Sequence, residues 1–179
     1  MKWEIDFIKY IFENIHSDIL TEAMKIITGL GNYGLMWIVL SAILIAYPKT
    51  RAKGISMAIS LIIMFISVNV IVKPFIDRAR PFEADMEILK NIAVSLPKDG
   101  SFPSGHTAAA FAASVCAFCY NKRQGIILLI IAFLIGISRL YLGVHFPTDI
   151  MGGIIFGTLS GITGFKLGCK IMQKNIKNS

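Results

Sequence analysis

Three residues at the end of one apolar run have the types and spacing of a phosphate-handling site: Arg139, His145 and Asp149. A guanidinium is a permanent positive group whose fork of donors matches phosphate oxygens. Histidine is the side chain that acts as nucleophile or proton carrier near neutral pH. An aspartate four residues later can accept a hydrogen bond from the second ring nitrogen, which fixes the tautomer and makes the ring more basic. This stretch therefore predicts half of a site that acts on a phosphate group.

A second pair of cations, Lys73 and Arg80, lies seven residues apart at the end of another apolar run. Two fixed positive charges in this place can neutralise a phosphate. The alternative is an interfacial pair whose charged heads reach from the end of a span toward water. Arg78, between them, is interpreted as a solvated loop residue outside the site.

A third polar group, Ser104, Gly105 and His106, stands directly before a further apolar run. The N-terminus of a helix presents free N–H groups and a positive dipole end, which suit a phosphate. Glycine lets the backbone come close, the serine hydroxyl adds a donor, and His106 can protonate a leaving oxygen. The alternative makes Ser104 a helix cap and His106 an interfacial polar residue.

The elements that must position these groups are membrane helices. Of the 179 residues, 55% are hydrophobic and 16% are charged, whereas an ordinary soluble domain carries about 25% charge. The mean hydropathy is +0.66. Five spans of about 20 residues each use most of such a chain, so we expect a single all-α domain over 1–179. The net charge of +7 falls in short gaps between apolar runs and in the tail, which indicates membrane topology and not nucleic-acid binding.

The apolar runs predict a helical bundle of about five transmembrane helices, preceded by amphipathic helices. Residues 3–16 place apolar and charged side chains on opposite sides of a helix, with Glu4 among the charged ones. With a second helix, residues 1–30 form the part expected in the membrane interface. The spans are expected at about 33–47, 55–72, 104–120, 126–138 and 150–168. A polar loop over 73–102 joins the second span to the third, and loops of this length are often functional.

Charge asymmetry predicts the orientation of the bundle. The turns at 48–54 and 121–125 and the tail from Lys166 carry Lys and Arg without Asp or Glu, so they are expected on the cytoplasmic side. Residues 1–30 hold three Lys against five Asp or Glu, and alternation puts them on the opposite side with all three groups of candidate residues. Ionisable side chains at membrane depth are costly and usually functional. The candidate site is therefore expected to face outward.

Together the three segments resemble the motifs of the type 2 phosphatidic acid phosphatase family, membrane relatives of the vanadium haloperoxidases. The family's pattern is a Lys, six residues and Arg-Pro; then Pro-Ser-Gly-His; then Ser-Arg, five residues, His, three residues and Asp. The sequence matches every motif position, from Lys73 to Pro81, from Pro103 to His106 and from Ser138 to Asp149. The resemblance covers 73–149, the motif-bearing core of the chain.

The resemblance implies a metal-independent phosphatase without a cofactor. His145 would attack the phosphorus to give a phosphohistidine, oriented by Asp149, and His106 would protonate the leaving oxygen and later activate water. The residues that would hold the phosphoryl oxygens and stabilise the transition state are Lys73, Arg80, Ser104, Gly105 and Arg139. The residues supply no carboxylate cluster for a metal, which agrees with this scheme.

The expected substrate is a lipid phosphate or diphosphate whose tail stays in the bilayer of a bacterial cell membrane. Small bacterial members with this layout resemble undecaprenyl diphosphate phosphatases, which recycle the cell-wall lipid carrier, and this activity is the first choice. Phosphatidylglycerophosphate or phosphatidate phosphatase activity is the alternative, because the motifs bind the phosphate and not the tail. A lipid-carrier binding or transport protein is the alternative of another class, although it would not require the two histidines and the aspartate. The sequence does not determine the oligomeric state.

Overall fold

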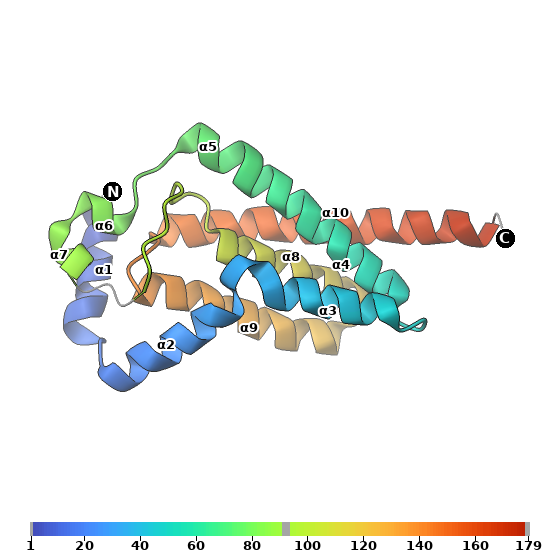
Figure 1. Ribbon diagram of the computed structural model, residues 1–179, viewed down its shortest axis with the longest axis horizontal. Coiled ribbons are helices and arrows are strands. Elements are labelled where there is room, and N and C mark those ends of the chain that lie inside the picture. The colour runs from blue at the N-terminus through green and yellow to red at the C-terminus, as the bar shows by residue number, and fades with distance from the viewer. Residues whose placement is uncertain (1, 91–93, 178–179) are drawn as a thin grey trace.

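The computed structural model describes residues 2–90 and 94–177, and within them every regular element is a helix. The long helices lie together in an elongated bundle (Figure 1). The N-terminus lies at one end of this bundle among short helices, and the C-terminal end of α10 (Pro147–Lys177) lies at the other. The prediction of an all-α chain is confirmed for this described part.

The first part of the chain contains two helices before the first strongly apolar one. Its elements are α1 (Lys2–Asn14), α2 (Asp18–Leu30), a 3₁₀ turn η1 (Asn32–Gly34) and α3 (Leu35–Ala46). The hydroxyl of Ser17 caps α2 by accepting a hydrogen bond from the backbone N–H of Leu20 at 3.4 Å. The chain bends in η1, where Tyr33 and Gly34 have positive φ values of 54° and 66°. The bend places η1 against α8 (Gly105–Tyr120).

The remaining long helices form the rest of the bundle. They are α4 (Arg51–Met64), which continues through the π-helical segment η2 (Phe65–Val72), then α8, α9 (Lys122–Tyr141) and α10. Four stretches of the described chain are long and apolar enough to cross a membrane: Asp18–Ala46, Arg51–Ala84, Lys122–Tyr141 and Pro147–Gln173. The α8 helix is apolar but shorter. The five expected spans therefore lie in these four stretches and in α8.

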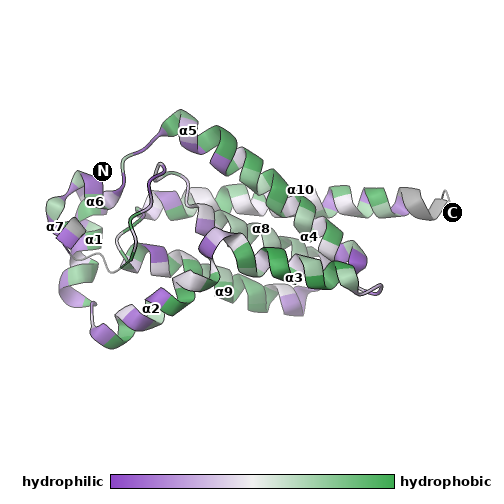
Figure 2. Cartoon of the chain, in the orientation of Figure 1, coloured by the Kyte–Doolittle hydropathy of each residue, from purple (hydrophilic) through white to green (hydrophobic). Residues whose placement is uncertain are grey.

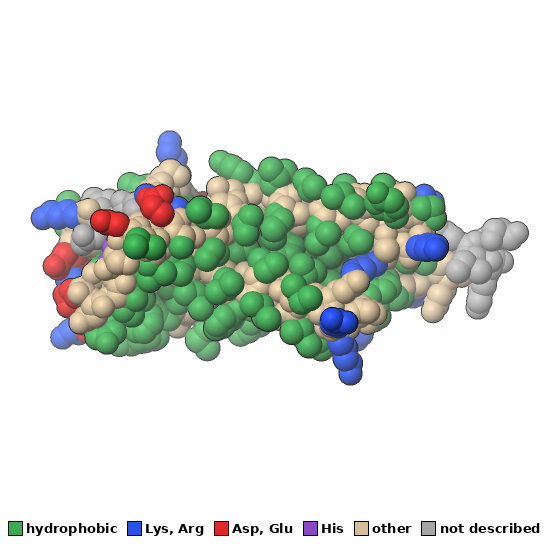
Figure 3. All heavy atoms as spheres, turned by 90° about the horizontal axis from the view of Figure 1, so that it is seen from below, with side chains coloured by type: hydrophobic (Ala, Val, Ile, Leu, Met, Phe, Trp, Pro, Cys, Tyr) green, Lys and Arg blue, Asp and Glu red, His purple; other side chains and the backbone are tan. Residues whose placement is uncertain are grey.

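The surface of the bundle has an apolar middle and charged ends. Hydrophobic residues run along α3, α4 and α9, while the helices near the N-terminus mix hydrophobic and hydrophilic residues (Figure 2). In the space-filling view, hydrophobic side chains cover the middle of the molecule, and Asp and Glu side chains gather at the end that holds α1 (Figure 3). Such an apolar belt matches the hydrocarbon layer of a bilayer.

The α8 helix lies at the centre of the bundle, in contact with α4, α9 and α10. Its buried face consists largely of alanines: Ala108, Ala109, Ala110, Ala112, Ala113 and Ala117. The α10 helix meets this face with glycines. A Cβ atom on Gly157 would lie 2.5 Å from the carbonyl oxygen of Ala108, and one on Gly161 would lie 2.8 Å from that of Ala112. Small residues on both helices thus allow the two backbones to approach closely.

Replacing Gly157 by alanine is expected to lower the free energy of unfolding by about 1–3 kcal/mol, because the added methyl group pushes α10 away from the backbone of α8. Gly29→Ala in α2 is the matched control, since nothing lies within 4 Å of a Cβ atom at that position. Thermal unfolding in detergent measures both variants. The midpoint should fall for Gly157→Ala only, and equal midpoints would contradict the close contact between α8 and α10.

The prediction of a single polar loop over 73–102 is wrong for the first half of this segment. It contains three short helices, α5 (Lys73–Ile76), α6 (Pro81–Ala84) and α7 (Met86–Lys90), while 91–93 lie outside the described residues. The α6 helix begins with a proline, whose fixed φ suits a first helical position. Its Glu83 side chain accepts a hydrogen bond from the backbone N–H of Arg80 at 2.7 Å. These local signals act over too few residues to produce a visible helical period.

The basic turn expected at 121–125 is also corrected. Residues from Lys122 onward form the first turn of α9, and the Asn121 side chain caps that helix by accepting a hydrogen bond from the N–H of Gln124 at 3.0 Å. A short asparagine side chain at this position satisfies an N–H group that the helix leaves free. The fourth apolar helix is consequently longer than its apolar run.

Candidate active site

A cavity of about 1120 Å³ lies between the helices at the end of the bundle that holds the sequence motifs. One part of its wall carries basic and titratable side chains: Lys73, Arg80, His106, Arg139 and His145. Another part is apolar and comes from α3, α4 and η2: Ile38, Leu61, Ile62 and Phe65. The three sequence segments therefore do meet, and they meet beside an apolar wall.

The turn between α9 and α10 places His145 in this wall. The turn is tight because Gly143 has a φ of 68°, a conformation that favours glycine. The His145 side chain is 2% exposed. Its Nδ1 atom lies 3.4 Å from Oδ2 of Asp149, and its Nε2 atom lies 3.4 Å from the guanidinium of Arg80. Burial holds the pKa of His145 below its ordinary value, an effect that Asp149 only partly opposes, so the ring is neutral near pH 7.

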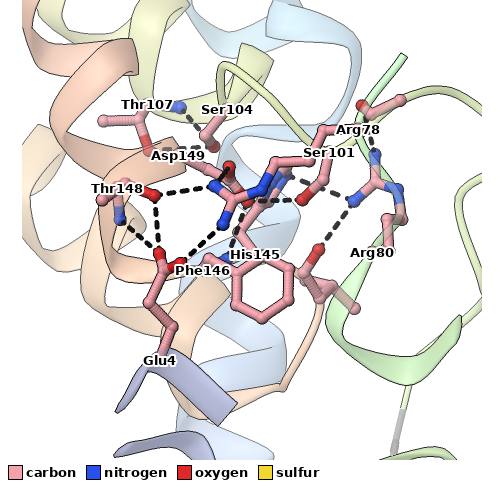
Figure 4. Close-up of polar contacts among 12 residues, drawn as sticks. Glu4, Arg78, Arg80, Ser101, Ser104, Thr107, His145, Phe146, Thr148 and Asp149 are labelled. Carbon is pink, nitrogen blue, oxygen red and sulfur yellow. Dashed lines mark hydrogen bonds and ion pairs between the residues drawn. The ribbon is translucent and has the colours of Figure 1, made fainter. Parts of the chain in front are cut away.

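Asp149 is fully buried behind that ring and is fixed by several donors (Figure 4). It lies in the first turn of α10, and its Oδ2 atom reaches back to accept the backbone N–H of Phe146 at 2.7 Å. A side chain at the third position of the helix thus accepts the N–H of the residue before the helix, as in a capping box. The hydroxyl of Ser101 donates to the same oxygen. The other carboxylate oxygen of Asp149, Oδ1, accepts a hydrogen bond from Arg78 at 2.7 Å. The carboxylate therefore has a defined position relative to Nδ1 of His145.

The interpretation of Arg78 as a solvated loop residue is wrong. Its side chain is only 17% exposed. The guanidinium donates to Asp149 and to Oε2 of Glu4 at 2.6 Å, and it lies over the ring of Phe146 with 4.3 Å to the ring centroid. The reason is tertiary: α1 covers this part of the chain, which no local pattern around Arg78 indicates.

Lys73 and Arg80 are buried and share one carboxylate. Their exposed fractions are 6% and 2%, so they are not an interfacial pair with solvated heads. Arg80 donates hydrogen bonds to Oδ1 of Asp99 at 2.8 Å and to the carbonyl of Val144 at 2.7 Å. Lys73 donates a hydrogen bond to Oδ2 of Asp99. Burial disfavours the Asp99 carboxylate, but the two cations outweigh it and hold its pKa below its ordinary value. An anion thus already bridges the two predicted phosphate ligands.

The start of α8 contributes Gly105 and His106 to the cavity wall. His106 Nε2 lies 3.1 Å from Oδ1 of Asn32 in η1. Ser104 is fully buried and caps α8, since its hydroxyl oxygen accepts from the N–H of Thr107 at 3.5 Å and from the Thr107 hydroxyl at 3.0 Å. It is not among the residues that line the cavity. For Ser104 the structural alternative is therefore present, and its contact with a phosphate stays a prediction.

Arg139 points into the cavity from the last turn of α9 and is 5% exposed. One of its terminal nitrogens donates to the hydroxyl of Thr28 in α2 at 2.7 Å. Its Nε atom is buried and has no hydrogen-bond partner among the residues that the structure describes. Buried donors of this kind usually have a partner, so an incoming anion is the natural acceptor for this one.

The sequence motifs missed the residues that support them from outside: Glu4, Thr28, Asn32, Asp99 and Ser101. One of these had a local signal. Glu4 lies four and seven residues before Ile8 and Ile11, and all three are buried on one face of α1. A carboxylate on an apolar stripe at helical spacing indicates a buried partner. The other four are brought in by long-range folding.

The arrangement has the parts of a phosphoryl-transfer site. A neutral imidazole is backed by a carboxylate, and three buried cations and a second histidine line the same cavity. Within residues 2–90 and 94–177 there is no group of three or more His, Cys, Asp or Glu side chains arranged to hold a metal ion. The donors that are present suit an anion, because they are cations and N–H groups.

Comparisons with known proteins find sequence relatives of this chain. The family model described as the PAP2 superfamily matches residues 49–172, which is more than half of the chain. The chain is 33% identical over 126 residues to the bacitracin transport permease protein BcrC of Bacillus licheniformis, a match that covers 68% of this chain and 61% of that relative. It is 28% identical to the undecaprenyl-diphosphatase BcrC of Bacillus subtilis, over 84% of this chain and 76% of that protein.

A solved structure is also similar. It is the crystal structure of a transmembrane PAP2-type phosphatidylglycerolphosphate phosphatase from Bacillus subtilis, which superposes with a TM-score of 0.74 at 31% identity. The superposition covers 97% of this chain and 86% of that one. The similarity therefore includes α1 and α2, which precede the stretch matched by the family model.

Proposed function

Because the chain belongs to the PAP2 superfamily, a family of metal-independent lipid phosphate hydrolases, we propose that it hydrolyses a lipid diphosphate through a phosphohistidine on His145. The observation that carries this proposal is the position of His145. Its Nδ1 atom faces Asp149, and its Nε2 atom lies beside Arg80 in a cavity that has both a cationic and an apolar wall.

In the first step, the lone pair on Nε2 of His145 forms a bond to phosphorus while the bond from phosphorus to the leaving oxygen breaks. His106 gives a proton to that oxygen. Charge that develops on the phosphoryl oxygens is stabilised by Lys73, Arg80 and Arg139, which are already fixed in place by the fold. Lys73 and Arg80 become available when the phosphate replaces the Asp99 carboxylate.

In the second step, water attacks the phosphorus of the phosphohistidine. His106 accepts a proton from this water, the bond between phosphorus and Nε2 breaks, and inorganic phosphate is released. Asp149 keeps the proton of His145 on Nδ1 throughout, which leaves Nε2 as the reacting atom. The cycle needs only the residues named here and one water molecule.

The apolar wall supports a lipid as the substrate. The side chains of Ile38, Leu61, Ile62 and Phe65 line the cavity from helices that also form the apolar belt. A lipid can place its phosphate among the cations while its chain stays between these helices, because apolar surface in the cavity is more stable against a hydrocarbon chain than against water. A soluble phosphate ester would leave this wall uncovered.

Undecaprenyl diphosphate is the first choice, and it would be converted to undecaprenyl phosphate. The undecaprenyl-diphosphatase BcrC of Bacillus subtilis, similar over most of both chains, supports it. Phosphatidylglycerophosphate is the second choice, and it is favoured by the similar phosphatidylglycerolphosphate phosphatase structure at 31% identity. One relative is named a transport permease, but binding without hydrolysis gives no role to the pairing of His145 with Asp149.

We place the chain in a bacterial cell membrane with the site on the outer face. The turn between α3 and α4, which carries Lys49, the first turn of α4 with Arg51 and Lys53, and the first turn of α9 all lie at the end of the bundle away from the motifs. Positive segments are retained in the cytoplasm. Phosphate release from lipid added to the outside of sealed, right-side-out vesicles tests this orientation, and release that requires lysis would contradict it.

The substrate is tested by phosphate release from the purified protein in detergent, in the presence of chelator. Undecaprenyl diphosphate, phosphatidylglycerophosphate and phosphatidate are compared side by side, and we expect the highest kcat/KM with the diphosphate. A higher value for either glycerolipid would assign the same site to phospholipid metabolism. The absence of release from all three lipids would favour the binding or transport alternative.

A further inference from the structure

We infer that Glu4, on the N-terminal helix α1, is a positioning residue for the nucleophile His145 and that it acts through Arg78 and Asp149. The inference rests on the proposed role of His145 as nucleophile. Glu4 and Arg78 lie outside the candidate residues that the sequence motifs supplied, and Glu4 precedes the stretch matched by the family model by many residues.

The contacts form a continuous chain from α1 to the reacting ring (Figure 4). Oε2 of Glu4 accepts a hydrogen bond from one terminal nitrogen of Arg78 at 2.6 Å. The other terminal nitrogen of Arg78 donates to Oδ1 of Asp149 at 2.7 Å. Oδ2 of Asp149 in turn faces Nδ1 of His145 at 3.4 Å. Two carboxylates thus hold one guanidinium from opposite sides.

Glu4 has a second attachment to the same helix start. Its Oε1 atom accepts a hydrogen bond from the hydroxyl of Thr148 at 2.6 Å, and the backbone N–H of Thr148 lies 3.4 Å away. The Thr148 hydroxyl also accepts a hydrogen bond from Arg78 at 2.7 Å. Thr148 is the neighbour of Asp149 in the first turn of α10. Glu4 therefore fixes the donor that holds Asp149 and also the helix turn that carries it.

Because both carboxylates are buried, each of them requires its partner. Glu4 is 3% exposed and Asp149 is fully buried, and a buried carboxylate is stable only when it is paired and hydrogen-bonded. Arg78 supplies that pairing to both. Its guanidinium is also packed on the ring of Phe146, so few other positions are open to it. Loss of Glu4 leaves Arg78 with one carboxylate and weakens its hold on Oδ1 of Asp149, while Phe146 and Ser101 still hold Oδ2.

The contact that depends on this orientation is a long one. At 3.4 Å from Oδ2 of Asp149, Nδ1 of His145 is within ion-pair distance, but it has no hydrogen-bond partner among the residues that the structure describes. A small rotation of the carboxylate therefore decides whether Asp149 can accept the Nδ1 proton, which sets the tautomer and the orientation of the proposed nucleophile. The expected effect is therefore on the chemical step and not on the binding of the lipid, whose phosphate is held by other residues.

The test compares Glu4→Ala and Glu4→Gln with a control on the same helix. Lys9→Met is matched, because Lys9 also pins α1 to the rest of the protein, by ion pairs of 2.9 Å to Asp85 and to Glu87, without touching the site. We expect Glu4→Ala to lower kcat about 10- to 100-fold, the usual cost of removing a partner that orients a site residue. We expect KM to change less than about twofold, and Lys9→Met to keep both constants.

Two further readouts separate positioning from simple attachment of α1. The rate of phosphohistidine formation in a single turnover should fall by the same factor as kcat. Glu4→Gln, which keeps one acceptor oxygen, should lose less activity than Glu4→Ala. The inference is overturned if kcat falls equally in Lys9→Met, or if Glu4→Ala raises KM and leaves kcat unchanged.

Controls keep the outcomes distinct. Thermal unfolding in detergent identifies a variant that does not fold, and in that case Glu4→Gln carries the decision. Wild-type protein and His145→Ala are measured in parallel. A wild type that releases no phosphate contradicts the proposed function. An active wild type with an inactive His145→Ala and an unchanged Glu4→Ala contradicts only the role of Glu4.

Discussion

Replacing His145 by alanine is expected to lower the rate of phosphate release by a factor on the order of 10⁴ or more, because removal of a nucleophile abolishes the covalent route. The ring is buried with Nδ1 toward Asp149 and Nε2 toward Arg80, so no neighbouring side chain is placed to substitute for it. Lipid binding should remain, since the three cations are unchanged. Phosphate release and retention of a labelled lipid by the detergent-solubilised protein measure the two properties separately.

The control for this change is another histidine. His16 lies outside the cavity, stacked on Tyr141 with 4.4 Å between ring centroids, and His16→Ala should keep most of the activity. Turnover by His145→Ala at a rate near that of the wild type would show that the phosphoryl group is not transferred to this residue.

Because burial holds the pKa of His145 below its ordinary value, protonation of the nucleophile occurs only at lower pH than for a free histidine. In the wild type, activity should therefore persist on acidification past the ordinary value of about 6.5.

Replacing His106 by alanine is expected to lower kcat by about 10²- to 10⁴-fold, the usual contribution of a general acid or base. The residue lines the cavity, and Asn32 holds its Nε2 atom. The loss should depend on the leaving group. A lipid phosphate is a weaker base than the alkoxide of a glycerol, so its departure needs less help from a proton. We therefore expect a smaller loss with undecaprenyl diphosphate than with phosphatidate.

Acid trapping of the phosphohistidine provides an independent measurement for this variant. With a good leaving group, the first step survives the loss of His106 better than the second step, in which water must be activated. His106→Ala should then accumulate the phosphorylated form of His145, and the double variant with His145→Ala should not. Equal losses for all substrates, with no accumulation, would assign His106 a structural role.

The sequence predicted the long helices and the residues that meet at the cavity because both leave local marks. Apolar runs give the helices, and His145 and Asp149 are four residues apart, so the turn before α10 brings them together. The loop was less predictable. The short helices α5, α6 and α7 depend on single residues such as Pro81 and Glu83, and these produce no period.

The pairs that the supporting residues form were not predictable for a different reason. Glu4 and Arg78 are 74 positions apart, and Asn32 and His106 are equally far apart. Neither pair forms unless α1 and η1 fold back over the end of the bundle. The amphipathic pattern of α1 also misplaced Glu4, because Trp3 and Phe7 are the exposed residues and Glu4 is on the buried face. The spacing of Glu4 with Ile8 and Ile11 was a local signal for the other side, and the fold decides which side of such a helix is covered.

In the proposed function, with Lys73 and Arg80 as ligands of the lipid phosphate, the carboxylate of Asp99 between them has a consequence for selectivity against the surrounding bilayer. A lipid head must displace one negative charge before it pairs with these cations, so its affinity reflects an exchange of anions and not the full attraction of an empty cationic site. Phosphate diesters of ordinary phospholipids carry a single charge and gain little from the exchange. A terminal phosphate carries about 1.5 to 2 charges at neutral pH and gains more. The abundant lipids of the membrane are thereby disfavoured as competitors without any contact to their tails.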